Sequence, residues 1–153
     1  MLEQLTNRVS GRNVAILGVG NPLRGDDGAG PALIERLQGK VRALLIDAGD
    51  VPENYLGPIE AFQPQTVLIV DAALLGAAPG DIALVEKEGL ANTTLSTHNA
   101  SLALFSRVIQ ATTDADILLL AIQPETTAFG SAISARVDKT LAYLEELLIR
   151  YVN

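Results

Sequence analysis

The chain has no cysteine, no tryptophan and a single histidine among its 153 residues. The lack of cysteine excludes disulfides, thiolate metal sites and cysteine nucleophiles. With one histidine, a two-histidine metalloprotease motif cannot exist either. Any metal site must therefore be built from carboxylate, imidazole and carbonyl ligands.

Positive charge is also scarce, with 11 Lys and Arg against 18 Asp and Glu, and a formal net charge of -7. Binding to phosphate backbones depends on clustered Lys and Arg, which this chain lacks, so we expect no nucleic-acid partner. The longest apolar runs have the length of strands, far short of the roughly 20 residues that cross a bilayer. The first ten residues lack a basic start followed by an apolar core. We therefore expect a cytoplasmic protein without a membrane partner.

Apolar runs and helical periodicity alternate along the chain, and its length suits one domain over residues 1–153. Buried strands are predicted over residues 13–20, 43–47, 66–72, 81–86 and 116–122. Helices are predicted from near Pro31 to Gly39, over residues 99–111, and near the C-terminus, where apolar residues recur at spacings of three and four. These are Ile133, Val137, Leu141, Leu144 and Leu148. The pattern predicts a three-layer α/β/α domain with a sheet covered on both faces.

The connection between the third and fourth predicted strands is too short for a crossover helix. A parallel neighbour needs a dozen or more residues, so the fourth strand is predicted to run antiparallel to the rest. Functional groups of such sheets gather at the carboxyl ends of the parallel strands. We therefore look for a site in the loops after residues 20, 47, 71 and 122.

The stretch "GVGNPLRGDDGAG" follows the first strand and raises two interpretations. A dinucleotide-binding loop needs a third glycine where Leu23 stands, and two adjacent acids would repel a phosphate. The second interpretation is a loop that presents a carboxylate. Gly18 and Gly20 allow a sharp turn, Asn21 starts the loop, and the acids Asp26 and Asp27 come just before a helix. We expect one acid to cap that helix and the other to point into a cleft.

Further candidates stand at the other strand ends. Asp71 closes the third strand and Asp47 the second, although each also fits an aspartate that bonds its own turn. His98 precedes the third helix, which Thr97 can cap. A neutral imidazole is favoured there, although a surface or capping role is the alternative. We expect one acid of the Asp26–Asp27 pair, Asp71 and His98 to converge into a site with three ligands.

These residues resemble the maturation endopeptidases of nickel-iron hydrogenases, particularly those that process the formate hydrogenlyase large subunit. The motifs "GVGNPLRGDDGAGP", "IDAGDVPEN", "LIVDA", "STHNASL" and "AIQPE" occur in the family's order over nearly the whole chain. The resemblance implies a phosphorylase/hydrolase-like, mixed five-stranded sheet of order 2-1-3-5-4. It also implies that the protein removes the C-terminal extension of a hydrogenase large-subunit precursor that presents nickel. Asp27, Asp71 and His98 are then the nickel-recognising and catalytic residues.

The chemistry leaves alternatives open. Water attack on the amide is expected, with either nickel polarising the carbonyl or a carboxylate as general base. A metal-independent Asp27–Asp71 dyad would require the two carboxylates to lie about 3 Å apart. A nickel-dependent chaperone that binds the precursor without cutting it is the alternative outside enzymes. We expect a monomer whose cleft is walled by residues 21–25 and 50–58.

Overall fold

A computed structural model describes residues 1–90 and 99–152 of the chain. Five strands form one sheet of order β2-β1-β3-β5-β4. Their bounds are β1 (Val14–Val19), β2 (Leu44–Gly49), β3 (Thr66–Ala72), β4 (Ile82–Glu86) and β5 (Asp116–Ile122). β4 pairs with β5 in antiparallel fashion, and the other neighbouring strands are parallel. The predicted strand order and the antiparallel fourth strand are both confirmed.

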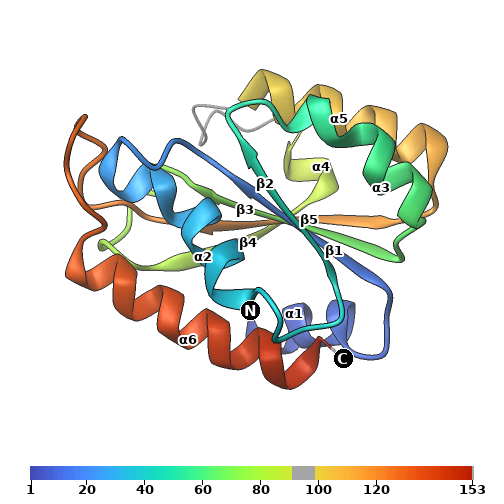
Figure 1. Ribbon diagram of the computed structural model, residues 1–153, viewed down its shortest axis with the longest axis horizontal. Coiled ribbons are helices and arrows are strands. Elements are labelled where there is room, and N and C mark those ends of the chain that lie inside the picture. The colour runs from blue at the N-terminus through green and yellow to red at the C-terminus, as the bar shows by residue number, and fades with distance from the viewer. Residues whose placement is uncertain (91–98, 153) are drawn as a thin grey trace.

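Helices cover both faces of the sheet (Figure 1). One face carries α1 (Leu2–Val9), α2 (Ala29–Leu37) and α6 (Ala135–Tyr151), and the other carries α3 (Leu56–Phe62), α4 (Lys87–Leu90) and α5 (Asn99–Thr112). Two short 3-10 helices, η1 (Gly25–Gly28) and η2 (Pro52–Tyr55), follow β1 and β2. Within residues 1–90 and 99–152, no helix has the length and apolar character to cross a bilayer.

The central strands are buried along their whole length because both faces of the sheet are covered. Every residue of β1 and β3 is buried. Successive side chains point to opposite faces, as the pleat of a strand requires. Ile16 and Leu68 pack under α2 and α6, whereas Leu17 and Ile69 pack under α3 and α5. Continuous apolar runs in the sequence therefore correspond to strands that sit between two helical layers.

The N-terminus and the start of the last helix differ from the sequence-based expectation. The first residues, to which no element was assigned, form α1, and Leu5 and Val9 of this helix are buried in the core. Ile133 lies outside α6, because Ser134 is the N-cap and its side chain accepts a hydrogen bond from the N–H of Val137. The apolar spacing continues one turn beyond the helix itself, which is why periodicity placed the start too early.

Ion pairs join α2 and the residues just after it to α6, on the surface of the layer formed by α1, α2 and α6. The Glu145 carboxylate lies 3.2 Å from Arg36 Nη1 and 2.6 Å from Lys40 Nζ. Arg36 also reaches Asp138 at 2.6 Å. The Lys40 hydrogen bond, with a smaller effect from Arg36, holds the pKa of Glu145 below its usual value.

The ion pairs of Glu145 with Lys40 and Arg36 predict a pH-dependent contribution to the stability of the fold. A lowered folded-state pKa stabilises the fold above the unfolded-state pKa of Glu145, and that gain is lost as the pH falls through the folded-state value. We expect Glu145→Gln to lower the melting temperature at neutral pH by a few degrees at most, since such pairs are solvent-screened. The difference should vanish in strongly acidic buffer. Thermal unfolding over a pH series measures it, with the exposed neighbour Glu146→Gln as control; equal curves for both variants would contradict the assignment.

Candidate active site

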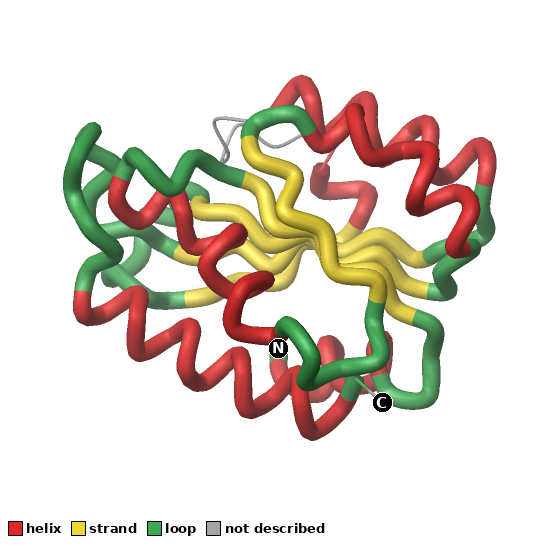
Figure 2. The backbone as a smooth tube through the Cα atoms, in the orientation of Figure 1, coloured by secondary structure: helices red, strands yellow, loops and turns green. Residues whose placement is uncertain are grey.

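The carboxyl ends of β1, β2, β3 and β5 lie at one edge of the sheet because these strands are parallel. The segments that follow them are residues 20–28, 50–55, 73–81 and 123–134. Figure 2 shows the loops after β1 and β5 next to each other at the left end of the molecule. Open α/β sheets place their ligand sites at this edge.

Asp27 is held against the end of β1. It lies in η1, is 7% exposed, and its Oδ2 accepts a hydrogen bond from the Asn21 N–H at 2.8 Å. Gly20 has a φ of 139°, and a Cβ there would collide with the Asp27 carbonyl oxygen. Only glycine combines this backbone conformation with such a close approach. The glycine-rich turn therefore presents a carboxylate at the strand end.

The first turn of α2 packs directly against the sheet. A Cβ on Gly30 would collide with the carbonyl oxygens of Val19 and Val70, at the ends of β1 and β3. A Cβ on Gly18 would likewise meet the carbonyl of Gly30. These missing side chains let η1 and α2 sit at the sheet edge, and η1 contacts β3 as well.

Asp71 occupies the neighbouring strand end. It is fully buried, and by the alternation of the strand it faces the same side as Ile69, which packs under α3 and α5. The register places Gly18 of β1 beside Val70 of β3. The fold therefore brings Asp71 and Asp27 to the ends of two adjacent inner strands, at the carboxyl edge of the sheet.

The third predicted ligand, His98, and its neighbour Thr97 lie outside the described residues. The helix that follows, α5, begins at Asn99 and leads into the parallel strand β5, so its first turn lies at the same edge of the sheet. It packs on the face toward which Asp71 points. Over residues 1–90 and 99–152, no three His, Asp or Glu side chains are grouped as a metal site requires. The convergence of His98 with the two acids stays a prediction.

Asp26 has a different position from its neighbour. Its carboxylate is fully buried and accepts hydrogen bonds from the Glu125 N–H at 2.8 Å, the Ser134 N–H at 2.7 Å and the Ser134 hydroxyl at 2.8 Å. Its own N–H donates to the Thr126 carbonyl at 2.9 Å, and the Gly25 N–H donates to the Ser131 carbonyl at 3.1 Å. We call residues 21–26 and 125–134, joined in this way, the Asp26 clamp.

The expectation that Asp26 or Asp27 caps the next helix is wrong. The N-cap of α2 is Gly28, and no side chain bonds to that end of the helix. Both acids lie within the 3-10 turn η1 that precedes α2, and their carboxylates reach the Asn21 N–H and the later loop instead.

Asp47 also differs from its expected place. It lies inside β2 rather than at its end, is exposed, and accepts a hydrogen bond from the Gly49 N–H at 3.1 Å. This is the local bond that the alternative interpretation described. Its position in the alternation matches Leu45, so it faces the α2 side, opposite to Asp71. There it lines a cavity of about 410 Å³ with Pro22 and Pro31.

Sequence reasoning did not identify Ser134 as part of this edge. A serine just before an amphipathic helix signals an N-cap, so that part of its role was readable. Its bonds to Asp26 were not readable, because they depend on two segments far apart in the chain. Asn21, by contrast, acts as the turn residue that was expected: its Oδ1 accepts a hydrogen bond from the Leu23 N–H at 2.9 Å.

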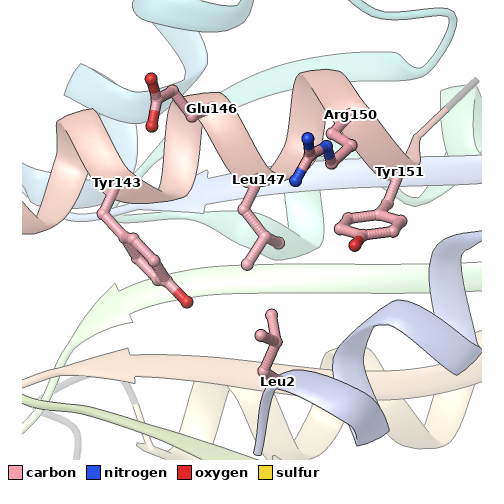
Figure 3. A pocket seen from close by; sticks show the side chains of 6 residues that line it. All are labelled: Leu2, Tyr143, Glu146, Leu147, Arg150 and Tyr151. Atoms are coloured by element: carbon pink, nitrogen blue, oxygen red, sulfur yellow. The ribbon is translucent and has the colours of Figure 1, made fainter.

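A pocket of about 350 Å³ lies elsewhere, between α1 and the second half of α6 (Figure 3). Figure 3 shows Leu2 and Leu147 pointing toward each other across it. Its charged lining residues are Glu146 and Arg150. This lining contains no pair of acids and no histidine, so the pocket does not compete with the carboxyl edge as a site for hydrolysis.

Known proteins share this fold. Residues 31–151 match the family HycI, hydrogenase maturation protease. The chain is 36% identical over 118 residues to the Hydrogenase 3 maturation protease of Escherichia coli K12, which covers 74% of each chain. It is 31% identical to the crystal structure of the NiFe hydrogenase maturation protease HycI from Thermococcus kodakarensis KOD1, with a TM-score of 0.89 over 97% of this chain and 98% of that one.

The protein therefore belongs to the hydrogenase maturation protease family, and the resemblance inferred from its motifs is confirmed. The maturating endopeptidase HybD of Escherichia coli shares the fold at 20% identity, with a TM-score of 0.75 over 89% of both chains. The family match begins at Pro31, after the two acids of the glycine-rich loop.

The contact between α2 and the sheet predicts a severe effect of a single methyl group. We expect Gly30→Ala to destabilise the fold by about 1–3 kcal/mol or more, because the new Cβ collides with two backbone carbonyls that cannot move independently. Gly57, also in a helix, has open space around its missing Cβ. Gly57→Ala is therefore the control, with no loss of stability expected. Urea unfolding compares them, and equal stabilities would refute the close approach.

The Asp26 clamp predicts that Asp26 contributes much more to the stability of the fold than an exposed aspartate does. Asp26→Ala leaves the N–H groups of Glu125 and Ser134 without the carboxylate that accepts from them, and we expect a loss of about 2–4 kcal/mol. The control is Asp81→Ala, since the Asp81 carboxylate is exposed and accepts only the local Ala78 N–H at 3.1 Å among the described contacts. Its removal should cost well under 1 kcal/mol. Denaturant unfolding tests both, and a small effect at Asp26 would contradict the clamp.

Proposed function

We propose that this protein is an endopeptidase that removes the C-terminal extension of a nickel-loaded NiFe hydrogenase large-subunit precursor. Asp27, Asp71 and His98 recognise the nickel that the precursor presents. The observation that supports this proposal is the placement of two buried acids, Asp27 and Asp71, at adjacent strand ends of a hydrogenase maturation protease fold.

The donor set suits recognition of a metal that another protein holds. Two carboxylates and one imidazole are fairly hard ligands and include no thiolate, so their affinity for free nickel is modest. A precursor that already holds nickel through softer ligands needs only additional donors. Cleavage then depends on the metal being in place, and an empty precursor is left uncut.

The reaction is water attack on the scissile amide. The Asn21 N–H bonds to one oxygen of Asp27 and so orients its carboxylate at the strand end. A carboxylate in this position can take the proton of the attacking water as general base. Nickel on the substrate polarises the carbonyl or the water. A serine, threonine or cysteine nucleophile is not proposed, because the single histidine is used in the recognition set.

The precursor as substrate explains why the complex with it is expected to be transient. Each precursor is cut once, so we propose that a monomer in the cytoplasm forms a transient complex with it. Residues 21–25 and the segment around η2 are the proposed walls of the cleft. η2 packs against α5, the helix that follows His98.

Replacement of the proposed ligands tests the function. We expect Asp27→Asn and His98→Ala to lower the processing rate of a nickel-loaded precursor by about 100-fold or more, because each removes a group needed at the reacting amide. Asp81→Asn, an exposed acid that bonds only locally in the described structure, should process at the normal rate. Intact-mass measurement of the precursor follows the reaction, and melting curves check that each variant is folded.

The outcomes separate the competing hypotheses. Binding of the loaded precursor without any change in its mass would identify a chaperone rather than a peptidase. Cleavage of a metal-free precursor at the normal rate would support an aspartic dyad and contradict nickel recognition. Full processing by both Asp27→Asn and His98→Ala would overturn the site.

A further inference from the structure

The most exposed large apolar side chains of the described chain gather at the edge that holds the candidate site. Phe129 is 76% exposed, Leu74 66% and Leu23 61%. Each lies in a loop that follows a parallel strand: β1 for Leu23, β3 for Leu74 and β5 for Phe129. Exposed apolar residues that cluster at one place mark interaction surfaces more often than scattered ones do.

Leu23 and Phe129 belong to one structural unit, the Asp26 clamp. The Gly130 N–H donates to the Leu23 carbonyl at 2.8 Å, which ties the residue after Phe129 to Leu23 itself. Two residues beyond Leu23, a Cβ on Gly25 would collide with Ser131 Oγ, so the two loops are also in close contact. Figure 1 shows the loop between β5 and α6 projecting at the left of the molecule.

The loop between β5 and α6 is long, yet hydrogen bonds hold it in one conformation. Residues 123–134 contain no helix or strand, and loops of about 12 residues without such structure are usually functional. A buried carboxylate and several backbone bonds order this one, at a cost in chain entropy. The result is a fixed loop with an aromatic side chain in water. Such an arrangement has a physical reason if that side chain is buried in a complex.

We propose that Leu23 and Phe129 are specificity-determining residues that contact apolar side chains of the precursor next to the scissile bond. This inference rests on the proposed function. Asp27 directly follows the clamp residue Asp26, so the distance from these contacts to the carboxylate is fixed by the clamp. A precursor seated on Leu23 and Phe129 is thereby placed in register with Asp27. The two side chains act in binding, and the acids act in the reaction.

Steady-state processing of a nickel-loaded large-subunit precursor tests the inference. We expect Leu23→Ser and Phe129→Ser each to raise KM about tenfold, and the double variant about 100-fold, as for central residues of an interface. The kcat and the melting temperature should stay unchanged, because neither side chain is packed in the core. The matched controls are Leu2→Ser and Tyr143→Ser, 43% and 46% exposed beside the pocket of Figure 3. They should leave KM unaltered.

A double-mutant cycle identifies the occupant. With the apolar residues that flank the scissile bond of the precursor changed to serine, the effect of Phe129→Ser on KM should largely disappear. An unchanged KM for the double variant overturns the proposal, as does an effect confined to kcat. A wild-type dimer in light scattering that Phe129→Ser dissociates also overturns it, because the surface then binds a second copy. Full processing by Asp27→Asn would instead contradict the proposed function, with the KM effect remaining as a separate result.

Discussion

The buried Asp26 carboxylate is the interaction on which the site edge depends. A carboxylate removed from water is costly unless hydrogen-bond donors replace the lost hydration. Here the donors are the Glu125 N–H and the N–H and hydroxyl of Ser134, which belong to the loop before the last helix. They meet Asp26 only when the chain is folded. The need of the Asp26 carboxylate for hydrogen-bond donors therefore joins the loop after β1 to the start of α6.

That junction sets the geometry of the neighbouring groups. Asp27 follows Asp26 in the same 3-10 turn, and α2 begins two residues later, so their positions are tied to the clamp. The contact of Gly30 with the ends of β1 and β3 fixes the turn from the other side. The Asp26 clamp and the Gly30 contact together hold the Asp27 carboxylate at the edge of the sheet. The same clamp orders the loop that carries Phe129, and so connects Asp27 to the surface that we propose for the precursor.

Much of the fold was predictable from local patterns. The predicted strands over residues 66–72 and 116–122 match β3 and β5, because a strand buried on both faces reads as a continuous apolar run. The antiparallel β4 followed from a connection too short for a crossover. Boundaries were less certain: β2 continues past Asp47, and α1 occupies residues without an expected element. These depend on pairing with β1 and on a core that receives Leu5, neither of which a local pattern records.

The sequence by itself determined the chemical inventory and the order of elements: no thiolate, one imidazole, and acids at the ends of apolar strands. It also carried the family motifs. Only the tertiary structure decided which partners each acid of the glycine-rich loop has. Asp26 and Asp27 are adjacent and identical in chemistry, yet one is satisfied by a loop about a hundred residues away and the other by the Asn21 N–H. The reason is physical: the state and partner of a carboxylate depend on burial and on nearby donors, which come from packing between distant segments.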